Sequence, residues 1–397
     1  MVGGWTTISE RFALQRNVIV ISLTLFVMMA AYFSWYLLLP LYLRQLGASN
    51  IQVGLSYTLL AISWAAMQLM GGFLADRVGR KPLIALPTFV AVLLYYLVGT
   101  SRTWQSLVVF LVLVNSFSAL QWPAFLSMLA ESVSSHRQGA AFSLMELFVV
   151  LGITVGPAVG AALLPRIGLS GLMMITALLA IPCAVVRAVF LRETKAQCRQ
   201  EDGRPARWLL QRRHGTFLMA AIFLALALTL TVYGPFIALY AKDIISLGES
   251  QINLMFALGG LAAIFLSLLG GRIIDRAGSR RVLMFCVLAF PSFLIGWTLT
   301  RSFLWSSSVY VVSYLLFHAA NISYQIQLTS IGPPTHRSSL VGIFGSISGM
   351  ISAAGPLLGS FLVSRAGAAM PFYVALAFSM LAFLFILLLN GRSKGEE

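Results

Sequence analysis

The stretch Gly71-Gly72-Phe73-Leu74-Ala75-Asp76-Arg77-Val78-Gly79-Arg80-Lys81-Pro82 places four charged residues between two long apolar runs. Only 10% of the chain is charged, so this cluster marks a point where the chain leaves an apolar environment. A degraded copy, Gly270-Gly271-Arg272-Ile273-Ile274-Asp275-Arg276-Ala277-Gly278-Ser279-Arg280-Arg281, begins 199 residues later. A repeat at half of the 397-residue length predicts two halves with one architecture.

The composition is that of a membrane protein. Hydrophobic residues make up 59% of the chain and charged residues 10%, whereas soluble domains carry about 25% charged residues. We therefore expect an all-α polytopic membrane protein. Basic residues at cytoplasmic loops explain the net charge of +15, so no nucleic-acid partner is expected. The three cysteines have neither metal nor disulfide spacing, and we expect no metal and no cofactor.

Twelve apolar segments follow one another along the chain. Each is long enough to cross the ~30 Å hydrocarbon core of a bilayer as a helix. The segments are 17–43, 52–75, 83–100, 104–130, 138–164, 169–191, 215–241, 252–274, 282–300, 304–331, 338–364 and 369–390. Residues 192–214 carry seven basic and three acidic residues and predict a cytoplasmic linker. We therefore predict one six-helix half at 1–191 and a second at 215–397.

The basic residues also predict the orientation. With the N-terminus inside, 21 of the 27 Lys and Arg residues fall on cytoplasmic ends and loops. The opposite orientation would invert that ratio, so we expect both termini in the cytoplasm. We expect the membrane to be the inner (plasma) membrane of a prokaryote.

The opening stretch resembles the loop between helices two and three of the major facilitator superfamily. The family pattern is Gly, three residues, Asp, a basic residue, any residue, Gly and two basic residues. The residues that fit it are Gly72, Asp76, Arg77, Gly79, Arg80 and Lys81. The second copy keeps Gly271, Asp275, Arg276, Gly278 and Arg281, with Ser279 at a usually basic position. The resemblance implies twelve helices in two parallel six-helix repeats, the fold of this superfamily.

The resemblance also implies that the turn is a conformational switch. Arg80 or Lys81 would pair with Glu131 at the cytoplasmic end of the fourth segment. Such contacts would hold the outward-open state and break when the cytoplasmic side opens. An ordinary basic turn at the cytoplasmic surface is the alternative.

A second motif lies in the fifth segment and resembles the antiporter motif of this family. Its residues are Gly152, Gly156, Pro157 and Gly160, and they recur in the eleventh segment as Gly355, Pro356 and Gly359. Glycines four residues apart let helices approach closely, and proline permits a bend. The resemblance implies drug efflux and a helix hinge, whereas simple packing is the alternative.

Only one acidic residue, Glu146, lies deep within an apolar segment. It follows Arg137 by nine residues, about 14 Å along a helix and close to the midplane. A charged carboxylate there costs about 2.5–3.5 kcal/mol, and such residues usually serve transport. We expect Glu146 to couple transport to protons, with His318 as a second candidate. A hydrogen-bonded structural glutamate is the alternative.

Polar and aromatic residues recur on single faces of several segments. In the tenth segment, spacings of four, four, three and four keep five of them on one face. A polar face within an apolar helix is expected to line a cavity. The expected lining residues are Tyr32, Tyr36, Tyr57, Trp64, Gln68, Asn115, Trp122, Tyr310, Tyr314, His318, Asn321 and Gln325. Such a cavity suits lipophilic or weakly cationic molecules.

The chain departs from the antiporter pattern in its basic residues. Drug antiporters of this family usually carry an arginine in helix four, where this chain has Leu111. Arg187 lies near the cytoplasmic end of the sixth segment, so we expect no basic side chain at mid-membrane depth. This expectation counts against organic anions as substrates.

We therefore predict a secondary active transporter that exports lipophilic or amphipathic small molecules by proton-coupled alternating access. Its expected partners are the small-molecule substrate, protons and the lipid bilayer, and we expect a monomer. An uptake symporter or facilitator for a sugar, another metabolite or a lipid is the first alternative. A non-transporting membrane sensor is the second. An enzyme is not expected, because one deep glutamate and one deep histidine in different halves form no catalytic cluster.

Overall fold

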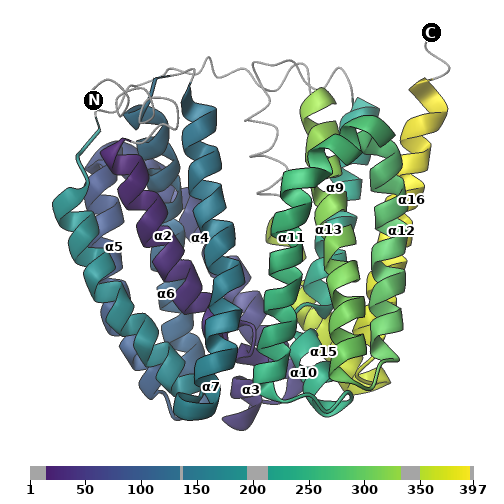
Figure 1. The fold of residues 1–397 in the computed structure, drawn as a ribbon, viewed down its shortest axis with the longest axis horizontal. Helices are drawn as coiled ribbons and strands as arrows, with labels where there is room; N and C mark the ends of the chain where they lie inside the picture. Colours follow the sequence, from purple (N-terminus) through teal and green to yellow (C-terminus); the bar gives the residue numbers. More distant parts are fainter. Residues whose placement is uncertain (1–14, 135–136, 195–212, 332–348, 394–397) are drawn as a thin grey trace, which may run out of the picture. The chain divides into compact units, whose positions relative to one another are not determined.

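The protein is described by a computed structural model that covers residues 15–134, 137–194, 213–331 and 349–393 (Figure 1). Within these ranges every regular element is a helix. The helices up to the linker are α2 (Arg16–Tyr36), α3 (Leu39–Gln45), α4 (Asn50–Val78), α5 (Arg80–Thr100), α6 (Trp104–Ser132) and α7 (Gln138–Phe190). Those after it are α9 (Arg213–Tyr233), α10 (Phe236–Asp243), α11 (Glu249–Ala277), α12 (Ser279–Thr298), α13 (Phe303–Ile331), α15 (Gly355–Ala366) and α16 (Met370–Ser393).

The membrane spans agree with the twelve expected segments. Ten stretches of the described chain are long and apolar enough to cross a membrane. One of them, α7, has 53 residues and turns at Gly168, so it holds the fifth and sixth segments. The eleventh segment is described only from residue 349 onward. The chain is therefore an all-α polytopic membrane protein, as its composition predicts.

The repeat seen in the sequence is also present in the backbone. Every described residue with a positive φ has a counterpart 199 residues away. The pairs are Gly47 (89°) with Ser246 (65°), Gly79 (99°) with Gly278 (84°), and Gly168 (67°) with Gly367 (102°). This region of φ is costly for residues with a Cβ, which explains the glycines at five of these positions. The two halves therefore share their turns as well as their motifs.

Contacts divide the chain into two compact units. The first unit comprises Met1–Gly47 and Ile62–Arg199, and the second comprises Ala48–Ala61 and Gln200–Glu397. The first turns of α4 belong to the second unit because Thr58 Oγ1 donates to the carbonyl oxygen of Ala353, 2.8 Å away. A Cβ on Gly54 would lie only 2.5 Å from the carbonyl oxygen of Pro356. The boundaries at 191 and 215 stay a prediction.

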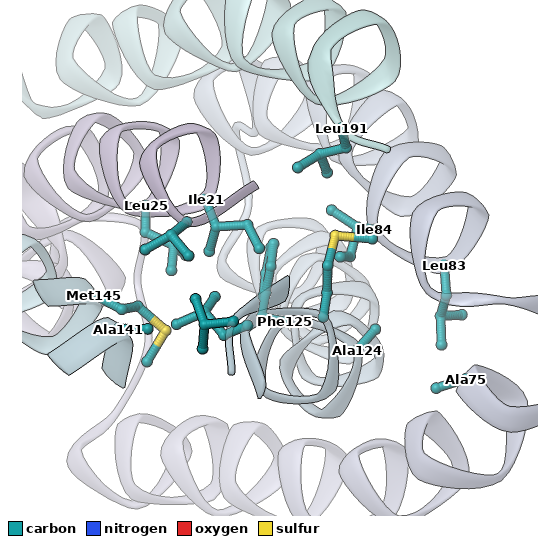
Figure 2. Close-up of a cluster of buried hydrophobic side chains, with 14 of the residues drawn as sticks. Ile21, Leu25, Ala75, Leu83, Ile84, Ala124, Phe125, Ala141, Met145 and Leu191 are labelled. Carbon is teal, nitrogen blue, oxygen red and sulfur yellow. The ribbon is translucent and has the colours of Figure 1, made fainter. Parts of the chain in front are cut away.

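The core of the first unit lies at the end of its helices that carries the Gly79 turn. Figure 2 shows Ile21 and Leu25 of α2 and Met145 of α7 gathered around α6, which contributes Phe125. Helices in lipid gain little from hydrophobic burial and depend on close packing. This packed layer fixes the positions of α2, α6 and α7 relative to one another at that end of the unit.

Glycines allow two helix pairs to pack closely, one pair in each unit. A Cβ on Gly156 of α7 would lie 2.6 Å from the Ala30 carbonyl oxygen of α2. In the second unit, a Cβ on Gly355 of α15 would clash with Oγ1 of Thr231 on α9. The neighbouring motif positions Gly152 and Gly359 approach α2 and α9 just as closely. The motif thus packs helices in both units, and its hinge role stays a prediction.

Candidate functional site

The first unit contains an open cavity of about 360 Å³ between α2, α4, α5, α6 and α7. Its wall is mostly apolar and aromatic, with a few neutral polar groups and one charged side chain. The lining residues are Leu25, Met28, Met29, Tyr32, Phe33, Tyr36, Trp64, Thr88, Ala91, Tyr95, Leu111, Val114, Asn115, Ser118, Gln121, Trp122, Phe125, Val149, Ile153 and Arg187. The cavity rests on the packed core, since Leu25, Phe125 and Val149 belong to both.

Five of the residues expected to line a cavity lie in this wall. Tyr32 and Tyr36 stack with ring centroids 4.6 Å apart, and the ring centroids of Trp64 and Trp122 lie 6.4 Å apart. Asn115 Nδ2 donates to Ser63 Oγ at 3.1 Å, which fixes its amide at the wall. These rings form flat apolar surfaces with few polar groups, an arrangement that favours flat apolar molecules.

Two other expected residues of α4 are not part of this wall. Gln68 belongs to the first unit but does not line the 360 Å³ cavity. Tyr57 belongs to the stretch of α4 that is grouped with the second unit. Their roles in substrate binding stay predictions.

The charged side chain in the cavity is Arg187, which is only 3% exposed. Its Nε donates to Thr24 Oγ1 at 3.0 Å, and its Nη1 donates to Thr88 Oγ1 at 2.9 Å and Gln121 Oε1 at 3.1 Å. The guanidinium carbon also lies 4.8 Å from the centre of the Phe125 ring. All of these partners are neutral. Among the described residues, no Asp or Glu forms a salt bridge with Arg187.

The placement of Arg187 corrects the expectation that no basic side chain lies at depth. Its Cα is three residues before the end of α7, but Cα–Cβ bonds in a helix point toward the N-terminus. The side chain therefore runs back into the bundle. There it meets Thr24 and Thr88, each eight residues, about 12 Å, past the start of its helix. The start of α2 lies next to the end of α7, because Asn17 Nδ2 donates to the Arg192 carbonyl oxygen at 3.0 Å.

Glu146 lies on α7 close to the cavity but not in its wall. It is one turn from Val149, which does line the cavity, and its side chain is exposed on the surface of the first unit. No hydrogen bond or salt bridge joins its carboxyl group to a described residue. The described contacts therefore do not support the alternative of a hydrogen-bonded structural glutamate. Its role in proton coupling stays a prediction.

The polar face of α13 belongs to the second unit. The rings of Tyr310 and Tyr314 stack at 5.8 Å, and His318 meets Tyr314 edge-on at 4.7 Å. Tyr310 is buried, because Gly259 of α11 leaves room for its ring. Asn321 is half-buried on the same face, and the side chain of Gln325 lies outside what the structure describes. The role of His318 in proton coupling stays a prediction.

The charged turn holds three parts of the first unit together. Arg80 Nη2 lies 3.1 Å from Glu131 Oε1 at the end of α6, which is one of the two pairs that the resemblance implies. Arg80 also donates to the Ala75 carbonyl oxygen, and Thr194 Oγ1 donates to Glu131 Oε2. The switch function of this pair stays a prediction.

A contact that the sequence did not predict involves Glu193, which follows α7. Its carboxylate accepts hydrogen bonds from the backbone N–H groups of Arg80 at 2.9 Å and Lys81 at 3.1 Å. These N–H groups open α5 and have no partner within the helix, and an acid at a helix N-terminus is favourable. The φ of 99° at Gly79 favours glycine, and a Cβ there would also crowd Glu193 Oε2, at 3.0 Å.

The other residues of the predicted switch make no described contact that defines a role. The side chains of Arg77, Arg276 and Arg281 are exposed, and a Cβ on Gly72 would meet nothing within 4 Å. The side chains of Asp76 and Asp275 and the surroundings of Gly271 lie outside the described part of the chain.

Comparisons with known proteins agree with this architecture. The family model described as Major Facilitator Superfamily matches residues 20–233 and 219–397. The multidrug resistance protein MdtG of Serratia proteamaculans is 27% identical over 298 residues, 71% of each chain. The multi-drug resistance efflux pump PmrA of Streptococcus pneumoniae is 26% identical over 271 residues, which cover 65% of this chain and 66% of the pump.

Solved structures show the same fold. A bacterial homologue of the human lysosomal transporter Spinster, in an inward-facing and occupied conformation, aligns with a TM-score of 0.80. The alignment covers 96% of this chain and 97% of that one at 16% sequence identity. At this identity the likeness concerns the fold alone.

Proposed function

Because this chain belongs to the major facilitator superfamily, we propose that it is a secondary active transporter that exports lipophilic or amphipathic small molecules. The observation that carries the proposal is the aromatic cavity of about 360 Å³ in the first unit. Small-molecule sites commonly occupy roughly 300–1,000 Å³, with apolar walls and a few placed polar groups. Relatives named as a multidrug resistance protein and an efflux pump support export rather than uptake.

The setting is a membrane. The chain is a multi-pass integral membrane protein, and its family and fold are those of transporters rather than enzymes. It acts as a monomer in the lipid bilayer of a prokaryotic inner membrane, with both termini in the cytoplasm. The distribution of 21 of 27 basic residues supports this orientation.

Proton coupling is assigned to Glu146. Its carboxyl group is exposed on the surface of the first unit, one turn from a residue of the cavity wall. In the protonated form it is neutral and tolerated when shielded from water, whereas access to water favours the ionised form. Proton and substrate are exchanged if each favours a different state of the bundle.

The switch is assigned to the charged turn. The Arg80–Glu131 pair is largely buried, with side-chain exposures of 6% and 16%. Breaking such a pair leaves a buried charge unsatisfied, so the two arrangements of the turn differ in energy. The pair therefore biases the equilibrium between the inward-open and outward-open states of the transporter.

The test is flux of a lipophilic dye in proteoliposomes with and without an imposed pH gradient. The wild type should concentrate dye against its gradient. Glu146→Gln should fold, since the amide resembles the neutral acid, and should keep downhill exchange but lose the pH-driven component. Glu249→Gln is the control, because it also neutralises an acidic side chain but at a residue that does not line the cavity. Glu249 lies at the start of α11, where it pairs with Lys242 at 3.9 Å. If the Glu146→Gln variant still concentrates dye using only the pH difference, Glu146 does not couple transport.

A further inference from the structure

We propose that Arg187 makes the cavity of the first unit an anion-binding site, so that the preferred substrates are amphipathic anions. Such a molecule has a flat apolar body and a carboxylate, sulfonate or phosphate group. The inference rests on the proposed export function and specifies the substrate class of the same cavity. It reverses the preference for weakly cationic molecules that the sequence predicts.

The first argument concerns charge. Arg187 is the only charged residue in the described wall of the cavity, and its described hydrogen-bond partners are the neutral Thr24, Thr88 and Gln121. These groups orient the guanidinium, but they do not neutralise it. A buried cation is costly unless an anion accompanies it. A negatively charged group entering the cavity would supply that missing charge, whereas a cation would be repelled.

The second argument comes from the repeat, which supplies an internal comparison. At an offset of 199 residues, the positions of Thr88, Gln121 and Arg187 correspond to Val287, Ala320 and Ile386. The offset holds here because α6 and α13 begin 199 residues apart, as do the turns Gly79 and Gly278 and the turns Gly168 and Gly367.

These three counterparts are all part of the hydrophobic core of the second unit. Val287, Ala320 and Ile386 are buried there in one cluster with Tyr324, the counterpart of Phe125. Equivalent positions thus carry apolar side chains in the second unit, whereas in the first unit they carry Arg187 and two of its hydrogen-bond partners. The fold does not need the cation, which leaves ligand binding as the reason for its cost.

The third argument is the match between guanidinium and ligand. A guanidinium presents several N–H donors in one plane and binds carboxylates, sulfonates and phosphates through paired hydrogen bonds. Only Nε and Nη1 are engaged by the described residues. The aromatic wall around Trp64 and Trp122 provides surfaces for a flat apolar body.

The experiment compares three probes with one apolar body and different charges. They are 4-(1-naphthyl)butanoate, its carboxamide and the corresponding 4-(1-naphthyl)butyl-trimethylammonium ion. Binding to the full-length protein in nanodiscs is measured by competition, and uptake into proteoliposomes is measured under the same pH gradient. The variants are Arg187→Gln, Arg187→Lys and the triple variant Thr88→Val, Gln121→Ala, Arg187→Ile.

In the wild type the butanoate should bind more tightly than the trimethylammonium ion. Arg187→Gln should weaken butanoate binding by about 10- to 100-fold, as expected for losing a hydrogen-bonded charge, and change carboxamide binding by less than about 3-fold. Arg187→Lys should keep part of the preference, because it keeps the charge. Equal weakening of butanoate and carboxamide would show a structural role and overturn the proposal. A wild type without anion preference would do the same.

The triple variant is the control for folding, since it copies the apolar packing of the second unit. It should remain monodisperse and at least as heat-stable as the wild type, yet show no preference for butanoate. A triple variant that retains the preference would place the anion elsewhere and overturn the proposal. Transport of the carboxamide separates the two hypotheses. If it is carried but the anion is not preferred, export stands and the anion site falls. If none of the three probes is carried by the wild type, the export proposal itself falls.

Discussion

Gly156→Ala distinguishes packing from hinge motion in the antiporter-like motif. The added methyl would lie 2.6 Å from the carbonyl oxygen of Ala30 and 3.0 Å from Cβ of Phe33. Ordinary contacts begin near 3.4 Å, so α2 and α7 must separate by about 0.8 Å at this point. The nearest obstacle is backbone, which does not turn away as a long side chain would.

The expected cost follows from this overlap. Forcing a methyl into a well-packed contact costs about 1–3 kcal/mol. Replacing glycine by alanine inside a helix returns about 0.5–1 kcal/mol. We therefore expect the free energy of unfolding to fall by about 1 kcal/mol, and by at most about 2.5 kcal/mol. The same separation would also disturb Tyr32 and Phe33 on α2, which line the cavity.

The assay is a denaturant titration in mixed micelles, with dye transport measured on the same preparations. Gly296→Ala is the matched control, because this glycine also lies inside a helix, α12, and an added methyl there meets nothing within 4 Å. It should be neutral or slightly stabilising. If Gly156→Ala and Gly296→Ala have equal stability while only the former loses transport, packing is not the role of Gly156 and the hinge explanation holds.

Three further predictions concern the switch and the second unit. Glu131→Gln should lower stability by about 1.5–3 kcal/mol in thermal unfolding, because Arg80 loses its charged partner, and an unchanged unfolding curve would remove this pair from the structural argument. Asp76→Asn should impair dye transport more than Asp275→Asn at equal surface expression, since the first copy keeps the full motif, and equal wild-type activity in both would contradict the switch hypothesis. Cysteines placed at 314, 318, 321 and 325 should react with water-soluble thiol reagents while those at 315, 316 and 319 do not, and a labelling pattern without helical period would take this face of α13 out of the substrate path.

Much of the architecture could be predicted from local sequence. Apolar segment length, the charged turn and the motif repeat each depend on residues close together in the chain, so the helical segments were predictable. The Arg80–Glu131 pair joins residues 51 positions apart and was implied by the family resemblance. The aromatic wall was partly predictable, because Trp64 and Trp122 lie on faces that the helical period reveals.

The electrostatics of the cavity were not predictable in the same way. The depth of Arg187 depends on the direction of its side chain from the end of α7 and on Thr24 and Thr88, which are distant in sequence. Glu193 was assigned to a linker by its composition, yet its carboxylate caps α5. The side-chain direction is a signal that could have found Arg187, because any long side chain near the C-terminal end of a helix points back along it.

The shared turns of the two halves have a consequence for how such a transporter acquires new substrates. Gly47 and Ser246 both have a positive φ although only one of them is glycine. The turn is therefore present even where its residue is not the glycine that favours it. The backbone frame and the residues that face its interior can therefore change independently. One half of the chain can acquire a charged cavity wall while the other retains an apolar filling, and substrate range then evolves within a scaffold that is already folded.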